Sequence, residues 1–255
     1  MAELVALLTD FGYRDVYVGV MKAVMLSVAP RLRFVDLSHD LPPYDVQAGM
    51  LALDAAWPYV PPGAVFLCVV DPGVGTPRRP IVVKAADRLF VGPDNGLFSL
   101  LPDAEAREIT APWGLPHRSR TFHGRDLFAP VAAHLAAGAP FLAVGPRIDP
   151  VRRPLPRPDG DRGEVIYVDH YGNCVTNLPG RAGGVIVTDS HTAPVREAYG
   201  DAAFGTLLAL TGSTGRLEVA VRNGSAAALG LGVGSRVEWR ATEADTGADD
   251  RRPPG

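Results

Sequence analysis

The segment AVFLCVVDPGVGTPRR, residues 64–79, joins an uninterrupted apolar run to a loop rich in glycine and proline. The run at 64–70 has the length of a buried strand, and the glycines and prolines mark the loop that follows. This loop begins at Asp71 and carries Arg78, so a carboxylate stands at a strand end and a guanidinium comes from the loop. Open α/β sheets bind ligands at that end of their strands. Taken alone, the same pattern is also typical of a tight turn with solvated arginines.

The residues before this strand alternate between strand and helix signals. Apolar runs at 4–8 and 34–37 have strand length, whereas 16–29 and 45–57 carry apolar residues at helical spacing and each end before a proline. Strands that are apolar throughout are buried on both faces, as in parallel sheets. The order β-α-β-α-β therefore predicts an α/β fold with a mainly parallel sheet covered by helices on both faces.

The rest of the chain suggests a second domain. After residue 79 the pattern predicts strands at 81–84 and 89–91 and a helix at 126–137. Short β-type runs separated by Gly and Asn turns then follow at 164–169, 175–176, 184–188, 217–221 and 236–239. Such runs are typical of a small β-barrel or β-sandwich.

Amino-acid composition indicates where the two expected domains begin and end. Residues 146–162 are rich in proline and arginine, which is typical of a linker. We therefore predict an N-terminal α/β domain at 1–145 and a C-terminal β-rich domain at 163–243. Residues 244–255 are polar with Gly and Pro, and we expect them to form a disordered tail.

Charge and composition narrow the class of partner. The 255 residues carry a formal net charge of −3, which gives no reason to expect binding to nucleic acid or to an anionic membrane. The N-terminus lacks the pattern of a signal peptide, and no stretch reaches the roughly 20 apolar residues of a membrane span. Cys68 and Cys174 lack metal-ligand spacing, and the histidines share none, so we predict no metal site. We expect a soluble, cytoplasmic protein that binds a small molecule.

Other polar residues are expected at the same edge of the sheet as Asp71. Asp10 follows the strand at 4–8, where a carboxylate can accept hydrogen bonds from both hydroxyls of a ribose. The alternative for such a residue is a helix cap, which fits Asp15 better. His123 and Gly124 precede the helix expected at 126, and Gly124 is predicted to bind substrate because glycine permits close approach to the backbone at a helix start. His123 is expected to face the site, although a lone histidine is more often structural.

The C-terminal region carries a second polar cluster after its first expected strand. Asn173 offers an amide that can read the hydrogen-bonding edge of a base. Tyr44 and Tyr199 can stack on the face of a base, or each can belong to a core. From the residues alone, both readings of the tyrosines stay open.

Six motifs, in this order, resemble those of the S-adenosyl-L-methionine hydroxide adenosyltransferases, which are relatives of the fluorinases and chlorinases. The resemblance covers about residues 4–240, and the ordered set is far more specific than any one motif. The motifs are TDFG at 9–12, DPGVGT at 71–76, GPDNG at 92–96, FHGRD at 122–126, YGN at 171–173 with TN at 176–177, and STGRLEVA at 213–220.

The resemblance implies an N-terminal α/β domain, a C-terminal β-barrel-like domain, and a homotrimer with active sites between neighbouring subunits. It also implies a reaction that uses no cofactor. Hydroxide derived from water attacks the 5′ carbon of S-adenosylmethionine, giving adenosine and methionine. The family's catalytic Asp, Arg and His correspond to Asp71, Arg78 and His123. The same match implies that substrate is bound by Asp10 at the ribose hydroxyls, Tyr44 beside the sugar, Asn173 and Tyr199 at the adenine, and Asp169 and Ser213 at the methionine end.

Two rival functions are weighed against hydrolysis. In halogenases the positions of Asp71, His123 and Gly124 hold Tyr, Tyr and a Ser that contacts the halide, and a carboxylate at 71 would repel such an anion. The other rival is a non-catalytic trimer that binds a nucleoside.

Several assignments stay open at this point. The spacing around Asp169 differs by one residue from the halogenase pattern, and Thr214 stands where halogenases carry Arg, which leaves recognition of the methionine carboxylate undecided. The residues also leave open whether Asp71 or His123 is the base, and whether Arg79 can replace Arg78.

Overall fold

A computed structural model describes residues 3–242 of the chain. The chain divides into two compact units, Met1–Pro154 and Leu155–Gly255, and each is described here by itself. The division falls within the segment 146–162 that composition marks as a linker. The tail expected at 244–255 lies outside the described residues.

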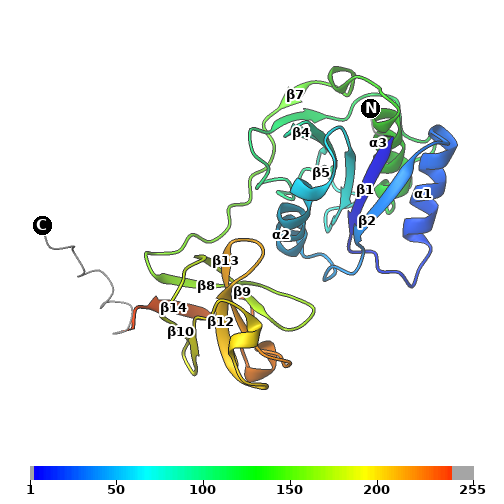
Figure 1. The fold of residues 1–255 in the computed structure, drawn as a ribbon. Helices are drawn as coiled ribbons and strands as arrows, with labels where there is room; N and C mark the ends of the chain where they lie inside the picture. The colour runs from blue at the N-terminus through cyan, green and yellow to red at the C-terminus, as the bar shows by residue number, and fades with distance from the viewer. Residues whose placement is uncertain (1–2, 243–255) are drawn as a thin grey trace, which may run out of the picture. The chain divides into compact units, whose positions relative to one another are not determined.

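A seven-stranded sheet forms the centre of the first unit (Figure 1). Its first four strands in spatial order pair in parallel, and the remaining pairings are antiparallel. In spatial order the strands are β2 (Arg33–Ser38), β1 (Leu4–Thr9), β3 (Val65–Val69), β5 (Arg88–Pro93), β4 (Pro80–Ala85), β6 (Glu105–Glu108) and β7 (Arg147–Ile148).

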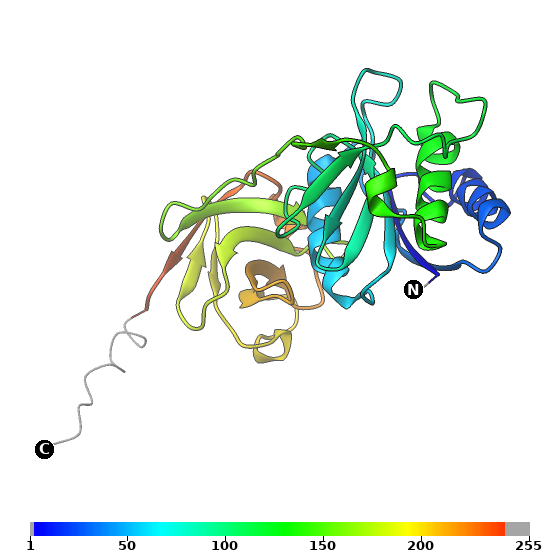
Figure 2. The same ribbon diagram turned by 90° about the horizontal axis from the view of Figure 1, so that it is seen from above.

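Helices cover both faces of this sheet (Figure 2). On one face α1 (Tyr17–Val28) and α3 (Ala129–Ala136) pack over Val5 and Leu7 of β1, in a core that includes Met21 and Met25. On the other face α2 (Val46–Ala56) packs over the alternate residues of β1 and β3. Successive side chains of a strand point to opposite faces, so two covered faces require strands that are apolar at every position.

The antiparallel half of the sheet differs from the predicted mainly parallel arrangement. Strands β4 and β5 form a hairpin whose turn residues Ala86 and Asp87 have φ of 45° and 57°. The dipeptides Asn-Gly and Asp-Gly predict such a turn from sequence, whereas Ala-Asp does not. Strands β6 and β7 are short, and the pairing of β7 with β6 carries the first unit past the predicted end at residue 145.

The helix expected at 126–137 also begins differently. A π-helical turn, Gly124–Phe128, precedes α3, so the wider turn starts directly after His123. Single π turns are frequent at functional sites. Short 3-10 turns at Trp57–Tyr59 and Phe141–Ala143 complete the first unit. No helix among residues 3–242 is both long enough and apolar enough to cross a membrane.

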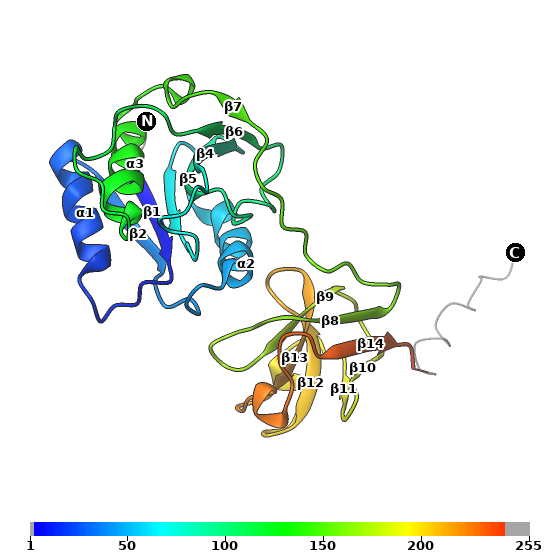
Figure 3. The ribbon, with the colours of Figure 1, turned by 180° about the vertical axis from the view of Figure 1, so that it is seen from behind.

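The second unit is an antiparallel sheet that curls toward a barrel (Figure 3). Backbone contacts between Val195 and Ala209 join its two outer strands, and residues such as Leu178 and Leu217 fill the core. In spatial order the strands are β11 (Thr192–Pro194), β10 (Val185–Val187), β14 (Arg236–Arg240), β8 (Arg162–Val168), β9 (Cys174–Pro179), β13 (Arg216–Val221) and β12 (Leu207–Thr211). Short 3-10 turns lie at Tyr199–Asp201 and Ala227–Leu229.

Candidate active site

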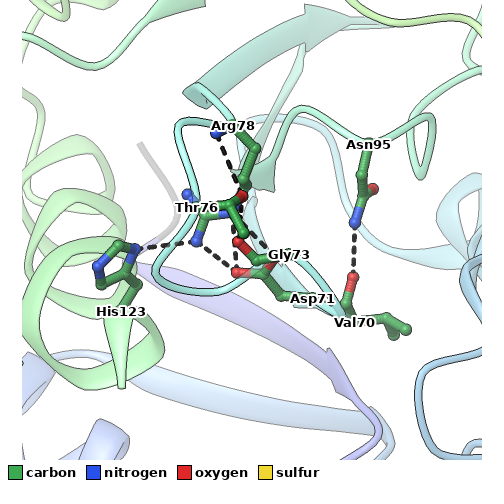
Figure 4. Close-up of polar contacts among 7 residues, drawn as sticks. All are labelled: Val70, Asp71, Gly73, Thr76, Arg78, Asn95 and His123. Atoms are coloured by element: carbon green, nitrogen blue, oxygen red, sulfur yellow. Dashed lines mark hydrogen bonds and ion pairs between the residues drawn. The ribbon is translucent and has the colours of Figure 1, made fainter. Parts of the chain in front are cut away.

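The loop after β3 folds back on itself and brings Arg78 onto Asp71 (Figure 4). Arg78 Nε donates to Oδ1 and Oδ2 of Asp71 at 2.9 and 3.0 Å, and Arg78 Nη2 donates to Oδ2 as well. Both side chains are nearly buried. Gly75 makes the turn possible, because its φ is +79° and a Cβ there would lie 2.6 Å from the carbonyl oxygen of Arg120.

His123 is the third member of this cluster. Its Nδ1 lies 2.9 Å from Arg78 Nη2. A guanidinium can only donate, so Nδ1 accepts and the neutral ring carries its proton on Nε2. Burial lowers the pKa of His123, and the positive charge of Arg78 lowers it further, so the ring is neutral at pH 7. The structure thus brings together the three residues predicted to be catalytic.

A cavity of about 340 Å³ opens beside this cluster. Asp71, His123 and Gly124 line it, together with an aromatic wall of Phe11, Tyr17 and Phe122 whose rings meet edge to face. The wall excludes water from part of the cavity, which strengthens electrostatic interactions with the charged groups that also line it.

The space around Gly124 leaves little room for a side chain. A Cβ at this position would lie 3.0 Å from Met21 Sδ, 3.2 Å from Phe122 Cε2 and 3.3 Å from Phe11 Cε2. The serine that halogenases carry here would require these neighbours to shift. Glycine at 124 therefore avoids a shift of these neighbours by a few tenths of an ångström.

Asp10 lies at the end of β1, next to the end of β3, as the parallel pairing requires. Its Oδ2 accepts from the backbone N–H of Tyr44 at 2.7 Å, and Tyr44 has a φ of 67° with an exposed side chain. Burial raises the pKa of Asp10 and the charge of Asp71 adds to this, while the Tyr44 hydrogen bond opposes it. The two carboxylates therefore lie close enough to interact electrostatically.

A buried network that the sequence analysis missed holds the Asp10 loop. His39 is fully buried, and its Nδ1 lies 2.7 Å from Thr9 Oγ1 while its Nε2 lies 3.1 Å from Asp36 Oδ1. Its carbonyl oxygen accepts from Gly12 N–H at 2.7 Å. His39 thus fixes the residues on both sides of Asp10. The available signal was its position just after the second strand, at the same edge of the sheet.

Arg79 points to different partners from Arg78. Its Nε donates to Asp94 Oδ2 at 2.8 Å and its Nη2 donates to the carbonyl oxygen of Asp149 at 2.9 Å. Asp94 Oδ1 accepts from Val151 N–H at 2.7 Å. This ion pair fastens the end of the first unit, so Arg79 does not stand in for Arg78.

Replacing Arg79 by alanine is expected to lower the free energy of unfolding by about 1–3 kcal/mol, because the buried Asp94 carboxylate loses its charged donor. Urea denaturation of both proteins measures this loss. Arg31→Ala is the matched control, since the ion pair of Arg31 with Glu3 is exposed and is worth at most about 1 kcal/mol. Equal losses in the two variants would contradict the prediction.

The C-terminal residues predicted to bind substrate line one cavity of the second unit, about 910 Å³ in volume: Asp169, Asn173, Tyr199 and Ser213. Asn173 Nδ2 donates to Asp169 Oδ2 at 2.8 Å and to the Tyr199 hydroxyl at 3.3 Å. Asp169 Oδ1 accepts from the backbone N–H groups of Tyr171 and Asn173. The Asp169 carboxylate therefore orients the Asn173 amide.

This cavity also contains Glu218, which the sequence analysis did not single out. Its signal was a carboxylate within the otherwise apolar run of a predicted strand, where charged residues are rare unless they are paired. Within residues 3–242 no group of three or more His, Cys, Asp or Glu side chains is arranged to hold a metal ion.

Comparison with protein families gives a match over most of the chain. Residues 5–145 match the SAM hydroxide adenosyltransferase N-terminal domain, and residues 163–238 match the C-terminal domain of the same family. The chain belongs to the SAM hydroxide adenosyltransferase family. Membership agrees with the resemblance of the six ordered motifs.

The similar proteins include several named as hydrolases of S-adenosyl-L-methionine and, at lower identity, a fluorinase. The (R)-S-adenosyl-L-methionine hydrolase of Thermus thermophilus is 46% identical over 249 residues, covering 90% of this chain and 96% of the relative. That of Salinispora tropica is 44% identical, covering 88% and 92%. A fluorinase of Nocardia brasiliensis is more distant, at 30% identity over 69% of this chain and 71% of its own.

A solved structure superimposes on this one. The crystal structure of an uncharacterized conserved protein from Thermotoga maritima has a TM-score of 0.86 at 37% identity, and covers 92% of this chain and 100% of its own. The α/β fold with a second, barrel-like β domain is therefore confirmed.

Proposed function

We propose that this chain hydrolyses S-adenosyl-L-methionine to adenosine and L-methionine, by attack of water on the ribose 5′ carbon. The observation that carries the proposal is the hydrogen-bonded cluster of Asp71, Arg78 and His123, of which Asp71 and His123 line a cavity. Support comes from relatives 42–46% identical over most of this chain that bear the name of this hydrolase.

The chemistry accounts for the residue types in the cluster. A sulfonium departs as a neutral thioether, so the leaving group needs no general acid. The nucleophile is the difficulty, because free water is a very weak acid and must lose a proton as it attacks. The site therefore needs a proton acceptor and a fixed positive charge near the attacking oxygen.

The geometry favours Asp71 as the acceptor. His123 Nδ1 already accepts from Arg78, which leaves the ring a donor at Nε2. The Asp71 oxygens accept from Arg78 and still have lone pairs for a water molecule. Arg78 holds both partners and, being always charged, stabilises the developing hydroxide. In this assignment His123 orients the water.

The remaining substrate contacts are assigned from the match to the family motifs, and Asn173, Tyr199 and Ser213 share one cavity. We assign Asp10 to the ribose hydroxyls, Tyr44 to the sugar, Asn173 and Tyr199 to the adenine, and Ser213 to the methionine end. Asp169 acts through Asn173, which it orients. We further propose a homotrimer in which neighbouring subunits complete each site, and native mass spectrometry tests that stoichiometry. The cytoplasmic location and the absence of a cofactor stay predictions.

Product analysis separates hydrolysis from halogenation. In chloride buffer made with ¹⁸O-water, we expect adenosine carrying one ¹⁸O at the 5′ position, together with methionine. Mass spectrometry identifies both products, and the same reaction in sulfate buffer is the control. A main product of 5′-chloro-5′-deoxyadenosine would establish the halogenase instead. Substrate that binds but yields no product in a single turnover would establish the binding protein.

A further inference from the structure

Glu218 is a buried carboxylate that faces the cavity of the second unit. It lies in the middle of β13, and the residue is 8% exposed. Among residues 3–242 no side chain or backbone group donates a hydrogen bond to its carboxylate, although it lines the 910 Å³ cavity. No fully buried side-chain oxygen of residues 3–242 lacks a partner, so the Glu218 oxygens open onto the cavity, and a ligand that fills it must supply a donor to keep the carboxylate satisfied. Such a group points to a ligand that supplies the donor.

The position of the carboxylate identifies one end of the cavity. A Cβ built on Gly212 would lie 1.8 Å from Glu218 Oε1 and 2.8 Å from Oε2, so the carboxylate lies directly against Gly212. Gly212 precedes Ser213, the residue assigned to the methionine end of the substrate. Glu218 therefore adjoins the residue assigned to the methionine end, and it is also near enough to Tyr199 and Asp169 to interact with them electrostatically.

The charges around this cavity favour a cation. Asp169 and Glu218 are both acidic, and burial together with the charge of Asp169 raises the pKa of Glu218. Arg222 also lines the cavity, but its Nη1 donates to the carbonyl oxygens of Gly200 and Ala202 and its guanidinium covers the ring of Phe204. The nearby arginine is thus engaged elsewhere. The open carboxylate is left for a positively charged group.

We propose that Glu218 accepts a charge-assisted hydrogen bond from the α-ammonium group of the methionine part of the substrate. The inference rests on the proposed function, because S-adenosylmethionine supplies that ammonium. The exocyclic amine of the adenine is another donor, but Asn173 and Tyr199 are the residues assigned to the base. Glu218 thereby selects for a substrate with an intact amino acid. This role fits a chain in which the spacing around Asp169 differs by one residue from the halogenase pattern.

The test compares three ligands: S-adenosylmethionine, its analogue with hydrogen in place of the α-amino group, and adenosine. Calorimetry should show that the wild type binds S-adenosylmethionine roughly 10- to 100-fold more tightly than the analogue, as expected for a charged hydrogen bond. Glu218→Gln should lose most of this ratio while keeping its affinity for the analogue and for adenosine. Glu197→Gln, at an exposed glutamate of the same unit, is the control and should keep the full ratio.

Each outcome separates the two proposals. Equal wild-type affinity for S-adenosylmethionine and the analogue overturns the role of Glu218 without any variant, even where Glu218→Gln fails to fold. A variant that keeps the full ratio, or that loses adenosine affinity to the same extent, overturns it too. A wild type that discriminates as expected but forms no adenosine supports Glu218 and overturns the hydrolase. A wild type that binds neither S-adenosylmethionine nor adenosine overturns both.

Discussion

Replacing Asp71 by asparagine is expected to lower kcat for S-adenosylmethionine hydrolysis by about 10²- to 10⁴-fold, the usual contribution of a positioned general base. Asparagine keeps the shape of the side chain and can still accept from Arg78. It cannot take the proton that water must lose during attack. Single-turnover formation of adenosine measures the chemical step, and parallel calorimetry should show substrate affinity within about threefold of the wild type.

Asp15→Asn provides the matched control for Asp71→Asn. Asp15 is an exposed carboxylate of the same unit, and its replacement should leave the rate unchanged. A wild-type rate in Asp71→Asn would remove Asp71 as the base. A comparable loss in His123→Ala would not distinguish the roles by itself, so the Asp71 result is decisive.

Replacing Arg78 by methionine is expected to lower kcat by about 10²- to 10³-fold, because a charge preorganised toward the developing hydroxide is lost. The same change should move the acid limb of the pH–rate profile. In the wild type, burial and Arg78 both lower the pKa of His123, so the ring becomes protonated only below its ordinary value near 6.5. Removing Arg78 takes away one of these causes, and the pKa of His123 should rise.

The direction in which the acid limb of the pH–rate profile moves tests this prediction. Activity that needs neutral His123 falls as pH drops through the pKa of the ring, so a raised pKa places the acid limb of Arg78→Met at higher pH than that of the wild type. Titration of the His123 ring by NMR follows the pKa directly. Arg78→Lys keeps a positive charge and should give a smaller displacement. An acid limb in Arg78→Met that coincides with the wild type contradicts the assignment.

Sequence patterns predicted the parallel part of the first sheet better than its antiparallel part. The strands that become β1 and β3 are apolar at every position, because helices cover both of their faces. β6 and β7 carry charged residues at the edge of the sheet, where burial no longer imposes a pattern. Their existence depends on pairing with residues distant in the chain.

In the candidate site, too, local sequence patterns predicted some residues and missed those whose surroundings depend on distant parts of the chain. Asp71 and His123 were predicted because each stands at a strand end or helix start within a motif, and Arg78 was predicted because it lies in the loop that begins at Asp71 and corresponds to the family's arginine. His39 and Glu218 were missed because their roles come from burial and from neighbours remote in sequence. The hydrogen bonds of Asp169 to backbone N–H groups and to the Asn173 amide were not predictable either, and they are the reason for proposing that Asp169 acts through Asn173.

The sequence by itself determined which residue types stand at the ends of which strands, and through its motifs the family to which the chain belongs. Only the tertiary structure decided which of these groups face one another. It separated Arg78 from Arg79, although they are adjacent in the chain, by giving each a different carboxylate. The physical reason is that periodicity and turn chemistry are local, whereas hydrogen-bond partners and burial depend on long-range packing that a single sequence does not display.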